Sequence, residues 1–377
     1  MTATGPNTQS SLFEDSFSTL QDPRRLIKGN IMYPINEILF LTISAVVSGS
    51  MAWTSIETFG EMKLDWLRKF YPYNNGIPSH DAISDLFSAL SPSAFGSCFM
   101  KWVNSISQIS EGEIVAIDGK TIRGAASSGN KKYPLHIVSA YAAHNRLCLG
   151  QEAVGEKSNE ITAIPRLLDL LSLKGCIVTI DAMGCQKEIA QKIVDKGADY
   201  VLMVKDNQAE LKEQVEKMFR LGNGVTSDSN VDAGHGRVET RVCNTTQDLT
   251  FFDTKEQWPH IKSVVQIKSE RMFKKTGETS TETRYYISTL PANAKHLNDS
   301  IRTHWAIENN LHWSLDVIFG EDGQLKRNGY SAQNFNIISK IALGLLEKEC
   351  TVKNTKPNKR LMAALNDNYR ASLITYC

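Results

Sequence analysis

Two aspartates, Asp118 and Asp181, each directly follow a short run of apolar, mostly β-branched residues. The runs are residues 114–117 and 176–180. Such runs are typical of strands buried in a sheet, so each aspartate is predicted at the carboxyl end of a core strand. Two carboxylates held together in a protein interior repel each other unless a cation lies between them. The pair therefore indicates cation-dependent chemistry.

A third acidic residue, Glu308, lies in a segment with the spacing of an amphipathic helix, residues 301–313. Asn298 or Ser300 is predicted to cap this helix. At 3.6 residues per turn, Glu308 shares a face with six mostly apolar residues: Ile301, His304, Trp305, Leu311, His312 and Leu315. An ionisable group in an apolar stripe indicates a functional role, and the alternative is a salt bridge to Arg302 or His304.

Three carboxylates from two strands and one late helix form the pattern of two-metal phosphodiester chemistry. Hard divalent cations prefer oxygen ligands. Two such ions can activate a water or a 3′-hydroxyl and stabilise the leaving oxygen. Each aspartate alone is weak evidence, because Asp-Gly after a strand is often a plain turn. The joint pattern predicts a nuclease or strand transferase.

The elements that must position these acids alternate between strands and helices. The order predicted from residue 114 to residue 205 is β-β-β-α-β-α-β, with crossover units at its end. The predicted strands are 114–118, 136–142, 147–154, 176–181 and 200–205, and the predicted helices are 159–171 and 186–196. In such a sheet the first and fourth strands can lie side by side, which would bring Asp118 and Asp181 to the same edge.

The flanking regions have different patterns. Residues 1–108 predict a helical N-terminal domain whose first 20 or so residues are frayed, and 109–208 predict the first part of the core. Residues 209–290 predict a mostly β insertion with strands at 237–244, 262–271 and 283–288. Residues 291–377 predict the Glu308 helix and further C-terminal helices.

Composition excludes several classes of protein. The 377 residues carry a formal net charge of +1, so no global basic signature of nucleic-acid binding exists. The seven cysteines form no CxxC pair, which indicates neither a zinc site nor a disulfide framework and favours a reducing cytoplasm. The N-terminus has no signal-peptide pattern, and the longest apolar run, 35–47, is too short and too polar to span a bilayer.

Five motifs together resemble those of the DDE transposases of bacterial insertion sequences, and in particular the H-repeat-associated proteins. The resemblance extends over nearly the whole chain from about residue 20. The motifs are Ala116-Ile117-Asp118-Gly119-Lys120, Ile180-Asp181-Ala182-Met183-Gly184-Cys185-Gln186, Val204-Lys205-Asp206-Asn207-Gln208, His235-Gly236-Arg237-Val238-Glu239 and His304-Trp305-Ala306-Ile307-Glu308-Asn309.

The resemblance implies an α/β fold: an RNase H-like catalytic domain with a mixed five-stranded sheet and flanking helices, a β-rich insertion, and a helical N-terminal domain. It implies Asp118, Asp181 and Glu308 as catalytic residues and metal ligands, with two Mg²⁺ ions that Mn²⁺ can replace. The expected partners are DNA, namely the transposon's terminal inverted repeats and target DNA, and a second copy of the chain when assembled on DNA. No membrane partner is expected.

Basic residues in and near these motifs are candidate phosphate contacts. The wider clan often has a Tyr seven residues before the glutamate, an Arg four before and a Lys seven after, where this chain has Ile301, His304 and Leu315. The DNA-binding candidates are Lys120, Arg123, Lys205, Arg237 and Arg241, with Arg302, His304 and Lys326 as possible replacements for the missing signature.

Two aromatic residues of the insertion, Trp258 and Phe273, could stack on an extruded base, but burial in the insertion's own core is favoured for both. Two other functions compete with an active transposase. One is a domesticated DNA-binding protein without transposition activity. The other is a phosphotransferase, because Asp-Gly-Lys-Thr resembles phosphohydrolase motifs; Ala116, however, stands where its nucleophilic aspartate would be.

Overall fold

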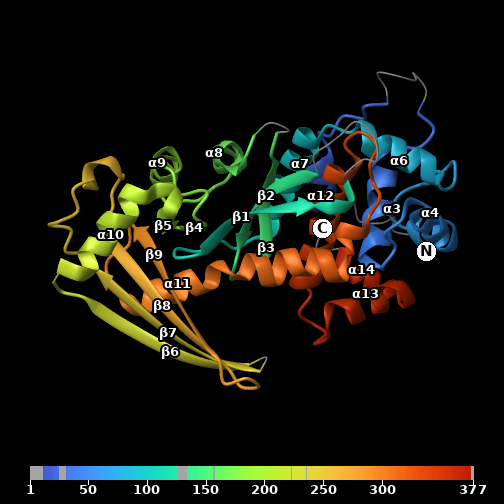
Figure 1. The fold of residues 1–377 in the computed structure, drawn as a ribbon. Coiled ribbons are helices and arrows are strands. Elements are labelled where there is room, and N and C mark those ends of the chain that lie inside the picture. Colours follow the sequence, from blue (N-terminus) through green and yellow to red (C-terminus); the bar gives the residue numbers. More distant parts are fainter. Residues whose placement is uncertain are drawn as a thin grey trace, which may run out of the picture.

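A computed structural model describes residues 12–24, 31–125, 134–155, 158–221, 223–234 and 236–374. Its centre is a single nine-stranded sheet with strand order β3-β2-β1-β4-β5-β9-β8-β7-β6 (Figure 1). The strands are β1 (Ile114–Ile122), β2 (Leu135–Ala142), β3 (Leu147–Ala153), β4 (Ile177–Ile180), β5 (Asp199–Val204), β6 (Thr226–Gly234), β7 (Arg237–Thr246), β8 (Ser263–Phe273) and β9 (Thr279–Ser288).

The first five strands follow the predicted order. With α8 (Glu160–Leu170) and α9 (Lys187–Asp195) they run β-β-β-α-β-α-β, as expected. Strand β1 pairs antiparallel with β2 and parallel with β4, and β4 pairs parallel with β5. The predicted neighbourhood of the first and fourth strands is therefore confirmed.

The prediction of a separate five-stranded sheet is wrong, because the insertion continues the same sheet. Strand β9 pairs antiparallel with β5, and β8, β7 and β6 follow outward. Strand β9 covers backbone groups that β5 would otherwise leave unpaired at an edge. Strand β6 was not predicted because its sequence, TSDSNVDAG, is mostly polar and exposed, without the alternation that marks a half-buried strand.

Helices cover both faces of the sheet. In Figure 1, α8, α9 and α10 (Ala209–Leu221) lie on one side, and α11 (Ala294–His304) runs beneath the strands on the other. Helix α8 packs on β2 and β3, whereas α11 packs on β1 and β4. The short 3₁₀ turns are Arg123–Ala125, Asp206–Gln208, Lys255–Gln257 and Glu321–Gly323.

The N-terminal region is helical, as predicted. Its helices are α1 (Leu12–Phe17), α3 (Ile35–Val47), α4 (Trp53–Met62), α5 (Leu64–Leu67), α6 (His80–Ala89) and α7 (Pro92–Ile106). Helix α1 packs on α7, and Phe17 is buried. The prediction that about the first 20 residues are frayed is therefore wrong for residues 12–20. Residues 1–11 of that predicted segment lie outside the described residues.

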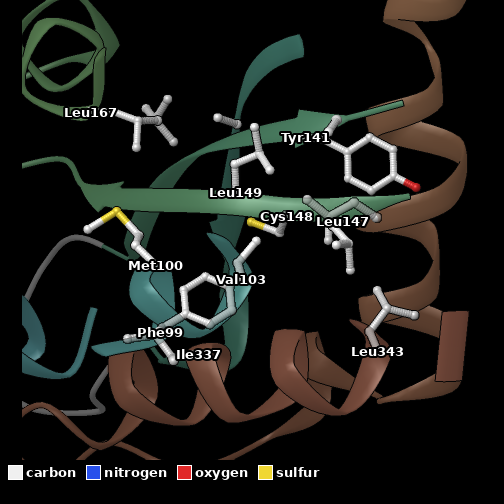
Figure 2. Close-up of a cluster of buried hydrophobic side chains, with 14 of the residues drawn as sticks. Phe99, Met100, Val103, Tyr141, Leu147, Cys148, Leu149, Leu167, Ile337 and Leu343 are labelled. Carbon is white, nitrogen blue, oxygen red and sulfur yellow. The ribbon is translucent and has the colours of Figure 1, made fainter. Parts of the chain in front are cut away.

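The C-terminal helices are α12 (Ser331–Lys348), α13 (Lys356–Leu365) and α14 (Asp367–Ile374). Helix α12 is buried along most of its length and packs against α3, α6, α7 and β3. Figure 2 shows α7 residues, among them Phe99, facing the same space as Leu149 of β3 and Ile337 of α12. One continuous hydrophobic cluster thus joins the N-terminal helices, the sheet and the C-terminal helices.

Within the described ranges, no helix combines the length and the apolar character that crossing a membrane requires.

Candidate active site

Asp118 and Asp181 come together because β4 is much shorter than β1. The parallel pairing of the two strands ends at Ile117 and Ile180, so each aspartate is the next residue in register. The prediction that Asp118 ends its strand is wrong, because β1 continues beside β2 to Ile122. Asp118 therefore lies in mid-strand beside a gap that opens where β4 stops.

Glu308 lies on a helical stretch with an unusual geometry. Helix α11 begins earlier than predicted, with the side chain of Asn293 accepting a hydrogen bond from the backbone N–H of His296. After Trp305 the helix widens into two π-helical segments, η4 (Ile307–His312) and η5 (Ser314–Ile318). Such π-helical turns frequently occur at functional sites.

The π-helical segments run alongside β1. His312 Nδ1 lies 3.5 Å from Asp118 Oδ2, and Asp316 Oδ1 lies 2.7 Å from Lys120 Nζ. His312 and Asp316, four residues apart on the helical segment, thus contact Asp118 and Lys120, which are two residues apart on β1. Glu308 precedes His312 by four residues and is exposed, whereas Asp118 keeps only 17% of its side chain exposed.

The acidic groups influence one another. Burial raises the pKa of Asp118 to about 7, and the carboxylates of Glu160, Asp181 and Glu308 add to this effect. Burial and Glu160 also raise the pKa of Asp181, against the opposing effects of two backbone N–H groups and Lys205. Burial and Asp181 raise the pKa of Glu308, and Arg284 opposes this. These carboxylates therefore share one local electrostatic field.

The chemistry of the donor set suits a divalent cation, because it consists of carboxylate oxygens whose negative charges are costly to hold together. The side chains do not converge in their present orientations. Asp181 Oδ1 accepts hydrogen bonds from the N–H groups of Met183 (3.1 Å) and Gly184 (3.4 Å), and Asp118 faces His312. Among the residues that the structure describes, no group of three or more His, Cys, Asp or Glu side chains could hold a metal as it stands. Ligation requires these side chains to turn.

His312 contacts Asp118 as a neutral ring. Burial, together with the charges of Lys340 and Lys120, lowers the pKa of His312 to about 3. The contact is therefore not an ion pair at neutral pH, and His312 Nε2 is buried with no hydrogen-bond partner among the described residues. His312 helps to place Asp118 without neutralising it.

The candidate DNA contacts differ in how much surface they expose. Lys205 is exposed and close enough to Asp181 to lower the pKa of that carboxyl, and Arg123 keeps 84% of its side chain exposed. Arg302 lines a cavity of about 580 Å³ between the β6–β7 hairpin and α11, together with Trp305, Asn309 and Asn310. Arg241 also lines it, but keeps only 13% of its side chain exposed and lies 3.6 Å from Glu239. Arg302 also forms an ion pair with Asp232.

Arg237, a fifth candidate, is exposed at the start of β7, on the turn from β6. The structure does not bring it to the three acids.

Three other candidates have partners inside the protein. Lys120 forms ion pairs with Asp316 and Glu321, both at 2.7 Å. His304 donates to or accepts from the hydroxyl of Thr179 at 2.9 Å, and burial lowers its pKa to about 4, so the ring carries no charge for a phosphate. These placements do not favour the expected DNA contacts.

Lys326, the third, is a buried lysine. Its ammonium group donates to the carbonyl of Met51 at 2.6 Å and lies 3.7 Å from the ring centroid of Phe335. Burial lowers its pKa to about 7. Of the two aromatic candidates in the insertion, Trp258 is buried as expected, whereas Phe273 is exposed at the end of β8.

The sequence pattern missed two charged residues near the site. One is Glu160, in the first turn of α8, although Gly119 beside Asp118 was a signal that another group approaches the strand closely. Lys340, on the buried helix α12, donates to Ser139 Oγ at 2.8 Å and Gln151 Oε1 at 2.7 Å. Ser139 is the cross-strand partner of Asp118, so Lys340 lies beneath the same face of the sheet.

Comparison with known proteins places most of the chain in known families. The family described as "Transposase DDE domain" matches residues 109–345, and that described as "DDE_Tnp_1-associated" matches residues 14–103. The chain is 41% identical to "Putative transposase YncI" of Escherichia coli O157:H7, over 96% of this chain and 94% of that protein. It is 38% identical to "H repeat-associated putative transposase YhhI" of Escherichia coli (strain K12), over 96% and 97%.

Among solved structures, the chain is similar to one described as a piggyBac transposase synaptic complex with hairpin DNA. The sequence identity is 12% and the TM-score is 0.44, over 96% of this chain and 79% of that one.

Proposed function

Since the chain belongs to the DDE transposases, and to the relatives of the H-repeat-associated proteins within them, we propose that it cuts and joins DNA at the ends of an insertion sequence. Asp118, Asp181 and Glu308 are the proposed catalytic acids. One observation carries this assignment: the parallel pairing of β1 and β4 ends at Ile117 and Ile180, which places Asp118 and Asp181 at the same edge of the sheet. Asp181 and Glu308 both raise the pKa of Asp118, in keeping with this placement. The three acids also occur in the chain order that the DDE pattern requires.

Mg²⁺ or Mn²⁺ bound by these three carboxylates would activate the attacking oxygen and stabilise charge on the leaving oxygen. The protein's own contribution is placement. The N–H groups of Met183 and Gly184 hold the carboxylate of Asp181, and the ring of His312 lies against Asp118, until these side chains turn to bind the ions. Glu308 is exposed, so its carboxylate is accessible from solvent.

The proposed DNA path passes the exposed cations around this gap. Lys205 and Arg123 are placed to contact phosphates beside the acids. Arg302 and Arg241 line the cavity between the β6–β7 hairpin and α11, where they lie beside Asp232 and Glu239, and Trp305 offers a flat ring there. Terminal inverted repeats and target DNA are the proposed partners, and the active assembly is proposed to be a homodimer formed on DNA.

Mapping of strand cuts tests the function directly. The purified chain is incubated with DNA carrying the candidate terminal repeats and Mg²⁺, and the cuts are located at nucleotide resolution. We expect cuts at the repeat ends that need Mg²⁺ or Mn²⁺, whereas Ca²⁺ permits binding with little cutting. Full activity in excess EDTA would remove the metal mechanism. Specific binding without any cutting would instead support the domesticated DNA-binding protein.

A further inference from the structure

Glu160 stands beside the proposed active site but on the other face of the sheet. Consecutive residues of a strand point to opposite faces. Asp118 faces the side of the π-helical segments, where it contacts His312, so Gly119 faces α8. A Cβ atom on Gly119 would come within 2.1 Å of Glu160 Oε1 and within 2.4 Å of His136 Nε2. Glu160 therefore occupies the space that a side chain at position 119 would fill.

A hydrogen-bonded chain holds Glu160 in this place. His136 Nε2 lies 2.7 Å from Glu160 Oε1, and His136 Nδ1 lies 2.8 Å from Thr121 Oγ1. Thr121 and His136 are direct cross-strand partners on β1 and β2. With Thr121 donating to Nδ1, the ring donates its Nε2 proton to an ionised Glu160. Within the described part of the chain, Glu160 makes this contact through Oε1 alone, which leaves Oε2 available.

Beyond the end of β4, this strand no longer separates the two faces of the sheet beside β1. A continuous sheet would separate Glu160 from Asp118, but β4 ends at Ile180, one residue before the two aspartates. The carboxylate of Glu160 thus lies against the residue that follows Asp118, at the edge of β1 where β4 has ended.

We propose that Glu160 is a fourth carboxylate of the cation site of Asp118, Asp181 and Glu308, held across Gly119 by His136. This inference rests on the proposed function, because it assigns a further ligand to the same cations. The competing explanation is structural: Glu160 would only anchor the start of α8 to β2 through His136. The two explanations differ in what removal of the charge does to cation affinity.

Isothermal titration of the full chain with Mn²⁺, without DNA, separates them. Glu160→Gln keeps the size of the side chain and an oxygen for His136 but removes the charge. We expect Mn²⁺ affinity to fall by about tenfold or more, the range seen when groups around a metal are changed. The matched control is Glu188→Gln, which changes an exposed glutamate in the first turn of the neighbouring α9. It should bind Mn²⁺ as the parent does.

Gly119→Ala tests the geometry while keeping every charge. The φ angle of Gly119 is not left-handed, so the backbone accepts alanine, but the added Cβ must displace the Glu160 carboxylate. We expect weaker Mn²⁺ binding, with the double variant no weaker than Glu160→Gln alone, because both changes remove the same ligand. Thermal unfolding of each variant confirms that it folds.

The results distinguish failure of the inference from failure of the function. Parent-like Mn²⁺ affinity in Glu160→Gln, with affinity lost in Asp118→Asn, overturns the role of Glu160 and leaves the three-acid site intact. Equal affinity in the parent and Asp118→Asn, or no binding by either, overturns metal ligation by the three acids, and the role of Glu160 with it. A lower unfolding temperature with unchanged affinity assigns Glu160 the structural role.

Discussion

The carboxyl group of Asp118 differs from a surface aspartate because of its place on β1. It is mostly buried and lies near other carboxylates, so its ionised form is disfavoured until a positive charge arrives. Lys120, two residues further on the same face, does not provide that charge because it is already bound to Asp316 and Glu321. The negative charge of the proposed catalytic acids is thus not neutralised by Lys120, because that lysine is paired with Asp316 and Glu321.

This division of roles predicts different outcomes for two acids of the π-helical stretch. Glu308→Gln keeps the shape of the side chain and removes a proposed metal ligand. DNA cleavage should fall by about 100-fold or more, because loss of a residue that only hydrogen-bonds to a metal ligand can already reduce activity by that factor. DNA binding and the unfolding temperature should stay near those of the parent. Asp316→Asn, which loosens only a partly exposed ion pair with Lys120, should cost much less cleavage activity.

Cleavage rates and binding affinities of the two variants, measured on the same DNA, check this assignment. It is wrong if Glu308→Gln cuts at nearly the parent rate, or if Asp316→Asn is the inactive variant.

The raised pKa of Asp118 predicts how stability changes with pH. Between its ordinary value of 3.8 and about 7, the folded protein binds a proton that the unfolded chain does not. The stability of the cation-free protein should therefore decrease as the pH rises through this range, whereas Mg²⁺ binding should strengthen. Unfolding temperatures of the parent and Asp118→Asn across the range measure the effect. A slope that is the same in both proteins would show that Asp118 titrates normally.

At the scale of elements, strand length and helix type decide where these side chains lie. Alternation and apolar runs predicted all five core strands and both crossover helices, because burial on two faces leaves a strong pattern. The pattern could not give the length of β1 beyond Asp118, since Asp-Gly is common in turns. Nor could it give the π-helical turns, because a widened helix keeps the same apolar spacing over so short a stretch.

Charged residues on these elements were less predictable than their strands. The sequence singled out Asp118, Asp181 and Glu308 as candidates because motif and position agreed, and their catalytic role stays a prediction. It could not separate Lys205, exposed after β5, from Lys326, which is buried, because both are single lysines in irregular segments. Glu160 escaped notice because an acid in the first turn of a helix is ordinary.

The buried Lys326 links two helical elements, which gives a matched test of the DNA path. Its ammonium group contacts the carbonyl of Met51 before α4 and the ring of Phe335 on α12. Lys326→Met should therefore leave the dependence of DNA affinity on salt concentration unchanged. Lys205→Met, which removes an exposed charge, should reduce the slope of log affinity against log salt by about 1.

Fluorescence titrations of both variants at several salt concentrations give the two slopes. A reduced slope for Lys326→Met would mean that this lysine leaves its internal site to contact DNA.

At the scale of the whole molecule, the N-terminal helices share the core of the catalytic region. Helix α12 buries most of its side chains against α3, α6 and α7 as well as against β3. The predicted division at residue 108 therefore separates two parts of the sequence whose apolar surfaces cover each other. Removal of one part leaves a large apolar face on the other, which favours aggregation.

A fragment beginning at residue 109 tests this coupling. We expect it to lack the cooperative unfolding transition of the full chain, or to be insoluble, because α12 loses its packing partners. Circular dichroism during heating measures the transition. A fragment that unfolds cooperatively near the temperature of the full chain would establish residues 109–377 as an independent domain.

The pairing of β9 with β5 also sets the order in which the site can form during folding. The chain between Asp181 and Glu308 includes all four outer strands, and it must close as one long loop before α11 can dock under β1 and β4. Closure of long loops delays folding, because entropy is lost before the distant contacts form. A chain still emerging from the ribosome holds both aspartates without the glutamate. Under the proposed function, such an incomplete chain cannot cut the DNA of its host.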